Sequence, residues 1–241
     1  MANTSWIIAL NSVEMINALR EYIFRRFNVS FSKAGDDIQL MKLINQHTPG
    51  TYVDVGCWHP KKASNTYHFY VRNWRGICID PNPELAPLYQ KFRPKDTFIN
   101  CGIGQSDESL DYFMLDDNAS SMNTFDFEFI KKHQLEGRIK KTLQIPLYPL
   151  SDVLEKNLRP GERLDFFDID VEGLDLSVLK TNDWNRFRPK VVVVETNFSI
   201  DQDITSEVVT YLASNDYDLV GKSIINGNLG NLFLIDRRKC K

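Results

Sequence analysis

The chain has 241 residues, of which 42% are hydrophobic, and a formal net charge of −3. This length suits one α/β domain with an accessory segment, and the slight acidity argues against a nucleic-acid-binding protein, which usually carries a basic face. The four cysteines are widely spaced and no apolar run could span a bilayer, which argues against a disulfide framework, a zinc site and a membrane protein. We therefore expect a cytoplasmic protein with reduced cysteines.

Residues 1–48 predict a helical extension ahead of the main domain. Apolar side chains recur at helical spacing from Thr4 to Phe27, and a second helix is expected from Asp37 to His47. Pro49 and Gly50 end this second helix. The apolar stripe of the first helix would pack on the domain or on a second subunit, giving a homodimer, or it would bind a membrane surface.

In residues 49–241, short apolar runs alternate with helical segments. This alternation, ending in two strands without a helix between them, predicts a Rossmann-like, mostly parallel sheet with a reversed C-terminal strand. The core strands are expected at 51–55, 76–79, 97–101, 164–169, 190–195, 217–222 and 231–235. The helices are expected at 64–73, 83–92, 151–157, 173–180 and 205–215. An insertion would hold strands at 109–115 and 143–147, a loop at 116–124 and a helix at 125–135.

The first two core strands end in acidic residues. Asp54 and Gly56 close the first strand, and Asp80 ends the second. Ligands of parallel α/β sheets bind outside the carboxyl ends of the strands, where these residues fall. Gly56 permits a sharp turn close to a ligand, but the G-x-G-x-x-G fingerprint is absent, which argues against NAD and favours a ligand without phosphates.

Asp80 has two possible roles. A carboxylate at this position is well placed to accept hydrogen bonds from both ribose hydroxyls of an adenosine. Its structural alternative is to cap the helix that begins at Pro83, although Asn82 is equally able to do so.

The densest acidic cluster is Asp168, Asp170 and Glu172, and Glu195 and Asn197 end the neighbouring strand. Carboxylates crowded at the mouth of a sheet should have perturbed pKa values. Their oxygens suit Mg²⁺ or Mn²⁺, and they equally suit an amino-acid ammonium group or the role of general base. The structural alternative is that Asp170 and Glu172 cap the next helix.

Several ordered motifs resemble the FkbM-type methyltransferases. They are F-S-K-A-G-D-D (31–37), D-V-G-C-W-H-P (54–60), S-N-T-Y (64–67), W-R-G-I-C-I-D-P-N-P (74–83), S-S-M-N-T-F (120–125) and D-I-D-V-E-G (168–173). Lys33 stands in the first motif where the family usually has Gln. The resemblance implies a seven-stranded methyltransferase fold that uses S-adenosylmethionine, and members mostly methylate hydroxyl groups of sugars or natural products.

The resemblance also implies which residues contact the cofactor. By carry-over, the methionine part is lined by Asp54, Gly56 and Cys57, with Ser64, Asn65 and Thr66 closing over it. The ribose is held by Asp80 beside Pro81 and Asn82, the adenine is flanked by Cys101 and Gly102, and the sulfonium end is faced by Asp168 or Asp170.

A sugar hydroxyl needs a base or a cation to favour the alkoxide. The candidate bases are His59, Asp170 and Glu195, and His59 could instead serve only its own loop. The competing mechanism is a divalent metal held by Asp168, Asp170, Glu195 or Asn197.

The leading hypothesis is therefore an O-methyltransferase acting on a saccharide, such as a nucleotide-linked sugar destined for a surface glycan. The alternatives are a methyltransferase acting on an amine or phosphoramidate of a glycan modification, and a non-catalytic nucleotide-binding module. The acceptor would be shaped by the loop-rich segments 116–141 and 226–230.

Overall fold

The structure is a computed structural model that describes residues 29–44, 48–105, 109–118 and 120–239, with isolated positions between 15 and 27. The predicted helix from Thr4 to Phe27 and the cysteine at position 240 fall largely outside these residues. Within the described part of the chain, no helix is both long enough and apolar enough to cross a bilayer.

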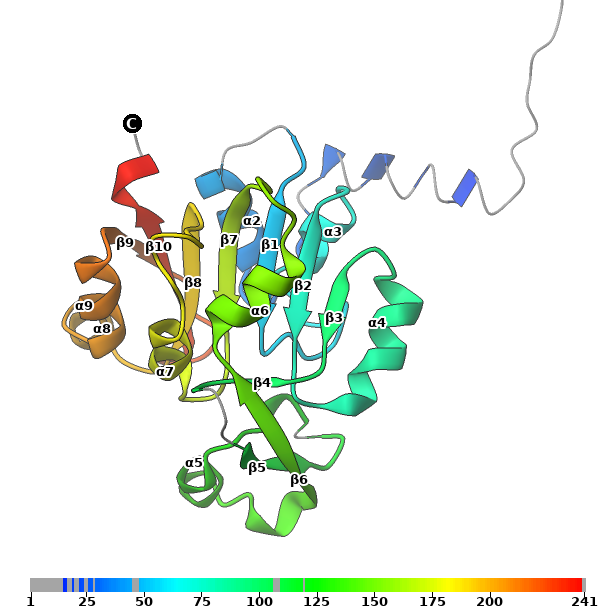
Figure 1. The fold of residues 1–241 in the computed structure, drawn as a ribbon, viewed down its shortest axis with the longest axis vertical. Coiled ribbons are helices and arrows are strands. Elements are labelled where there is room, and N and C mark those ends of the chain that lie inside the picture. Colours follow the sequence, from blue (N-terminus) through cyan, green and yellow to red (C-terminus); the bar gives the residue numbers. More distant parts are fainter. Residues whose placement is uncertain are drawn as a thin grey trace, which may run out of the picture.

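Seven strands form the main sheet, in the spatial order β3-β2-β1-β7-β8-β10-β9 (Figure 1). Only β10 runs antiparallel to its neighbours β8 and β9, so the predicted mostly parallel sheet with a reversed C-terminal strand is confirmed. The chain order reverses between β1 and β7, which is where doubly wound sheets bind ligands. The strands are β1 Thr51–Val55, β2 Arg75–Ile79, β3 Thr97–Ile99, β7 Leu164–Ile169, β8 Val191–Thr196, β9 Tyr217–Lys222 and β10 Gly230–Asp236.

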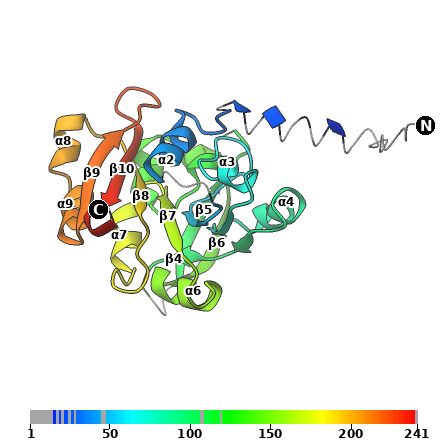
Figure 2. The same cartoon turned by 90° about the horizontal axis from the view of Figure 1, so that it is seen from above.

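Alternate residues of the central strands face opposite sides of the sheet, and each side carries its own apolar core. In β8, Val192 and Val194 belong to one core, whereas Val191 and Val193 belong to the other. The view from above shows helices on both faces of the sheet (Figure 2). The first core packs under α6 Leu150–Asn157, α7 Asp175–Lys180 and α9 Glu207–Ser214, and the second packs under α2 Asp36–Ile44, α3 Tyr67–Tyr70 and α4 Ala86–Phe92.

A separate three-stranded sheet lies beyond the carboxyl ends of the core strands (Figure 1). It consists of β4 Gly102–Ile103, β6 Ile139–Tyr148 and β5 Ser109–Leu115, with α5 Phe127–Lys132 beside it. The predicted strand 97–101 is therefore too long. It ends at Ile99 because the Asn100 side chain donates to the Asp80 carbonyl oxygen and the chain then turns to pair with β6.

Two helix predictions need correction. The helix expected over 64–73 is only α3, because the Ser64 and Thr66 side chains are engaged in hydrogen bonds of their own and Ala63 has a φ of 49°. Helix α8, Ile200–Ile204, was not predicted, although Ser199 and Gln202 form a capping box that starts it. Single 3₁₀ turns complete the structure at Pro83–Leu85, Ser120–Met122, Glu136–Arg138 and Arg237–Lys239.

The side chain of Arg93 is fully buried behind the carboxyl ends of β1 and β2. Its Nε donates to Asp96 at 2.7 Å, and its terminal nitrogens donate to the Tyr52 hydroxyl at 2.7 Å and to Thr66 Oγ1 at 3.0 Å. Burial lowers the pKa of the guanidinium. The surrounding ionisable groups raise this pKa by more than burial lowers it, so Arg93 stays charged. This network ties the loop after β1 to the core of the sheet.

We expect Arg93→Met to lower the free energy of unfolding by about 3–5 kcal/mol, because it leaves a buried carboxylate at Asp96 without its cation. Urea denaturation followed by circular dichroism measures the loss. The matched control is Arg186→Met, which breaks an ion pair of the same 2.7 Å length with Glu155, but with side chains 51% and 56% exposed. That variant should lose at most about 1 kcal/mol, and equal losses in the two variants would contradict the argument.

Candidate active site

A cavity partly open to solvent lies between the carboxyl ends of the core strands and the small sheet, and the space there, open solvent included, is about 600 Å³. Predicted site residues on its wall are Gly56, Asp80, Pro81, Cys101, Gly102 and Asp170. Further lining residues are Val55, Trp58, Ile79, Ile103, Tyr112, Ser120, Ser121, Asn123, Thr124, Phe125, Val171, Glu172, Leu174 and Val178.

Gly56 turns the chain at the floor of this cavity. Its φ is 81°, and an added Cβ would overlap the Asp170 carbonyl oxygen. The Gly56 amide donates to the Ile79 carbonyl at 2.9 Å, and the Asp170 amide donates to the Val55 carbonyl at 3.0 Å. The ends of β1, β2 and β7 are thus drawn together around a position that only glycine fits.

Asp80 presents a nearly buried carboxylate, 6% exposed, to the same cavity. It accepts hydrogen bonds from the Trp58 amide at 2.9 Å and the Asn82 amide at 2.8 Å. Burial raises the pKa of Asp80 to about 6, and these two hydrogen bonds limit the rise. Asn82, whose side chain accepts from the Glu84 amide at 2.9 Å, caps the following helix. Asp80 therefore does not serve as the cap of that helix.

Other predicted cofactor residues lie behind the wall rather than on it. Thr66 donates to Asp54 at 2.5 Å, and Asn65 donates to Asp168 at 3.1 Å. Asp54 and Asp168 are register partners on β1 and β7. Burial raises the pKa of both carboxyl groups, that of Asp54 to about 6. Ser64 is also buried, and its hydroxyl lies 3.2 Å from that of Thr66.

Cys57 and His59 also have partners away from the cavity. The Cys57 carbonyl accepts from the Tyr89 hydroxyl at 3.0 Å, and burial raises the pKa of its thiol. His59 Nδ1 accepts from the amides of Lys61 and Lys62 at 3.1 and 3.0 Å. Burial and the two lysines lower the pKa of His59. These hydrogen bonds order the loop that contains His59, and its ring does not line the cavity.

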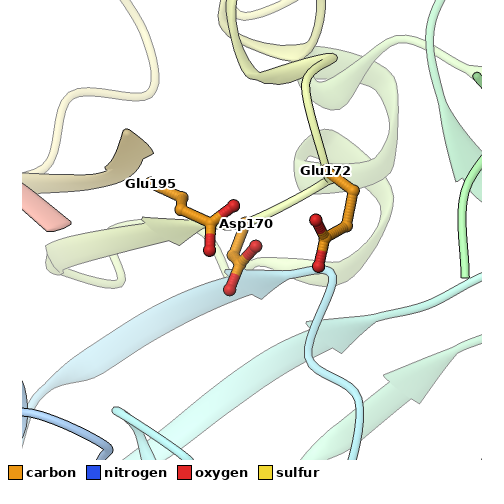
Figure 3. Close-up of side chains that lie close together, drawn as sticks. All are labelled: Asp170, Glu172 and Glu195. Carbon is orange, nitrogen blue, oxygen red and sulfur yellow. The ribbon is translucent and has the colours of Figure 1, made fainter. Parts of the chain in front are cut away.

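Three carboxylates lie close together (Figure 3), and two of their residues, Asp170 and Glu172, line the cavity. Asp170 follows β7, Glu172 lies in the next turn, and Glu195 is near the end of β8. One oxygen of each lies within 4.8 Å of the others. The structure thus groups Glu172 with Asp170 and Glu195, whereas Asp168 faces Asn65 and the Asn197 side chain is exposed.

Burial and the negative charge of Asp170 raise the pKa of Glu172 to about 8, and burial with the charges of Asp170 and Glu172 raises that of Glu195 to about 10. For Asp170, burial raises the pKa, and the positive charge of Lys33 and a hydrogen bond with Glu195 oppose the rise. The arrangement is that of a shared proton, in which protonated Glu195 donates to ionised Asp170. The ionised Asp170 of such a pair can accept a proton.

Some residues of the cavity wall are not among the predicted site residues. Trp58 belongs to the D-V-G-C-W-H-P motif, and Ser120, Asn123 and Phe125 belong to S-S-M-N-T-F. The sequence motifs mark these segments, but the contact of the segments with the cavity depends on where the small sheet folds back. The Asn123 side chain accepts from the Leu115 amide at 2.8 Å, which fixes the segment against β5.

Residues 50–219 match the family described as the Methyltransferase FkbM domain. No curated protein sequence matches the chain. Solved structures with a similar fold include a precorrin-6y C5,15-methyltransferase from Geobacter metallireducens (11% identity, TM-score 0.44, covering 97% of this chain and 94% of that one). A second is a 1,6-didemethyltoxoflavin-N1-methyltransferase from Burkholderia thailandensis with bound S-adenosylhomocysteine (9% identity, TM-score 0.44, covering 97% of this chain and 91% of that one). A third is an O-methyltransferase from Bacillus cereus (12% identity, TM-score 0.42, covering 96% of this chain and 93% of that one). Similarity at these identities concerns the fold and says nothing of substrate.

The raised pKa of Glu195 predicts a pH-dependent gain in stability for Glu195→Gln. The Glu195 carboxyl group has a pKa of about 4.5 in the unfolded state and about 10 in the folded state. Between these two pH values only the folded state holds the proton, so the stability of the wild type falls as the pH rises from about 4.5 to about 10. The neutral amide avoids this loss, so at pH 8 the variant should melt higher by about 2–4 °C, corresponding to ~1 kcal/mol. At pH 4 the two proteins should melt together. A constant difference across this pH range, measured by calorimetry, would contradict the assignment.

Proposed function

The chain belongs to the FkbM methyltransferase family, and we propose that it transfers a methyl group from S-adenosylmethionine to a hydroxyl group of a saccharide. One observation carries the proposal: a single cavity is lined both by the Gly56 turn and Asp80 and by Asp170 and Glu172 of the acidic cluster. This supports the proposal, because the residues proposed to hold the cofactor and the residue proposed to accept the proton line the same cavity.

The residues present fit this cofactor. Gly56 lets the backbone approach a ligand, and an ionised Asp80 can accept from ribose hydroxyls while keeping its two amide donors. Cys101 and Gly102 offer an apolar wall for an adenine ring. S-adenosylmethionine supplies a methyl group on a positively charged sulfur, which is a good leaving group. The contribution of the chain is to hold the reactants in line.

Acceptor activation is assigned to Asp170. Its carboxylate lines the cavity, and protonated Glu195 keeps it oriented by a hydrogen bond. A hydroxyl group bound beside Asp170 would give it the proton as the oxygen becomes the nucleophile. The same three carboxylates are hard oxygen ligands of the kind that hold Mg²⁺ or Mn²⁺, which would instead lower the pKa of the acceptor hydroxyl.

The acidic cluster also favours a second candidate, an amine acceptor on a glycan. The ionised Asp170 attracts an ammonium group as readily as it accepts a hydroxyl proton, and Glu172 and Glu195 beside it offer oxygens that accept hydrogen bonds from such a group. The two candidates are separated by testing a sugar and its amino-sugar counterpart as acceptors. The acceptor whose addition leads the protein to release S-adenosylhomocysteine from S-adenosylmethionine identifies the group that is methylated. Cofactor binding with no turnover on any acceptor would favour a non-catalytic module instead.

Asp80→Ala should weaken binding of S-adenosylmethionine and S-adenosylhomocysteine by about 10-fold or more, as expected for the loss of charge-assisted hydrogen bonds. Isothermal titration measures both ligands. The control is Asp201→Ala in α8, which removes a surface carboxylate outside the cavity and should leave both affinities unchanged. If wild-type protein binds neither ligand, the proposed function is wrong.

Asp170→Asn should lower kcat about 10²–10⁴-fold, the usual contribution of a general base, while S-adenosylhomocysteine binds within about twofold of wild type. Turnover is followed by release of S-adenosylhomocysteine with a saccharide panel, with and without Mn²⁺ and after chelation. Activity that needs Mn²⁺ would assign the carboxylates to a metal. A variant with unaltered kcat would remove Asp170 from the mechanism.

A further inference from the structure

Trp58 has an unusual backbone conformation at the edge of the cavity. Its φ is 40°, in the left-handed region that a bulky side chain rarely adopts. Such a conformation costs of the order of 1–3 kcal/mol and persists only where the surroundings enforce it. The enforcing contact is the hydrogen bond of 2.9 Å from the Trp58 amide to the Asp80 carboxylate.

The side chain of the same residue reaches the opposite wall. Its indole Nε1 donates to the Ser120 hydroxyl at 3.4 Å, and that hydroxyl in turn donates to the Asp117 carbonyl at 3.2 Å. Trp58 and Ser120 both line the cavity. One residue therefore connects, through its main chain and its side chain, two walls that lie 62 positions apart in the sequence.

The segment that carries Ser120 is also anchored at its other end, next to β5. Thr124 exchanges main-chain hydrogen bonds with Phe113 of β5 at 2.9 and 3.3 Å, and Asn123 binds the Leu115 amide. These contacts fix the end of the segment nearest β5. The end at Ser120 is held toward the core of the protein by the indole of Trp58.

We propose that Trp58 is a positioning residue that couples cofactor binding at Asp80 to the placement of the acceptor wall at Ser120. This inference rests on the proposed function, because it takes Asp80 as the ribose ligand. Ribose hydroxyls bound to the Asp80 carboxylate would fix its orientation and its hydrogen bond to the Trp58 amide. The hydrogen bond from the indole to Ser120 would then be held more firmly, so cofactor binding would stabilise the acceptor wall.

Hydrogen exchange of the amides in residues 120–125, with and without saturating S-adenosylhomocysteine, tests the coupling. In wild type the ligand should slow exchange by about fivefold, the factor that one hydrogen bond is worth. Trp58→Phe removes the indole N–H and keeps an aromatic ring, and Ser120→Ala removes the acceptor oxygen. Each variant should bind the ligand within about twofold of wild type and lose the slowing, and the double variant should lose no more.

The control is Trp184→Phe, which removes an indole N–H bonded to the Tyr211 hydroxyl at 3.1 Å outside the cavity. It should lower the melting temperature and leave the ligand-induced slowing intact. Slowing that persists in Trp58→Phe and Ser120→Ala would overturn the inference, as would loss of ligand binding in either one, because Trp58 would then act on the cofactor alone. Failure of wild type to bind the ligand would refute the proposed function itself.

Discussion

The buried charge of Arg93 is the constraint on which the candidate site depends. Four aspartates, Asp54, Asp80, Asp168 and Asp170, gather at the carboxyl ends of β1, β2 and β7 because the strand order places these ends side by side. Burial raises the pKa of Asp54, and the charge of Arg93 and the hydrogen bond from Thr66 oppose that rise. Without this fixed cation behind the sheet, the buried Asp54 would favour protonation more strongly, and its register partner Asp168 would lose the charged neighbour that raises its own pKa.

The acids at this edge divide into two kinds. Asp54, Asp80 and Asp168 each accept hydrogen bonds from protein donors, which fix their orientation. Glu172 and Glu195 are stabilised in the protonated form by burial and by the negative charge of Asp170. The first kind suits the binding of a ligand with fixed geometry, whereas the second suits the transfer of a proton. This division follows from the surroundings, since the side chains are chemically alike.

The sequence was most informative where local signals decide the structure. The bounds of β1, β7 and β9 match the predicted 51–55, 164–169 and 217–222, because each is an apolar run ended by a turn or an acidic residue. It was least informative where contacts between distant residues decide. The partners of Arg93 lie from 3 to 41 positions away, and no local pattern marks that residue as buried. The wall at Ser120 likewise depends on the folding back of the small sheet, which periodicity does not predict.

The charge of the cavity limits the acceptor that the proposed function can use. Among the described lining residues Asp80, Asp170 and Glu172 are acidic, and none is basic. Two like charges 4 Å apart repel by about 4 kcal/mol at an effective dielectric constant of 20. A phosphate beside ionised Asp80 or Asp170 would face such repulsion, and no basic residue among the described lining residues offsets it, although the charge of Lys33 acts on Asp170. If the acceptor is a nucleotide-linked sugar, its neutral sugar must therefore enter while its phosphates stay outside. An acceptor without phosphates, or one carrying an amine, meets no such barrier, and the same acids attract the positively charged cofactor.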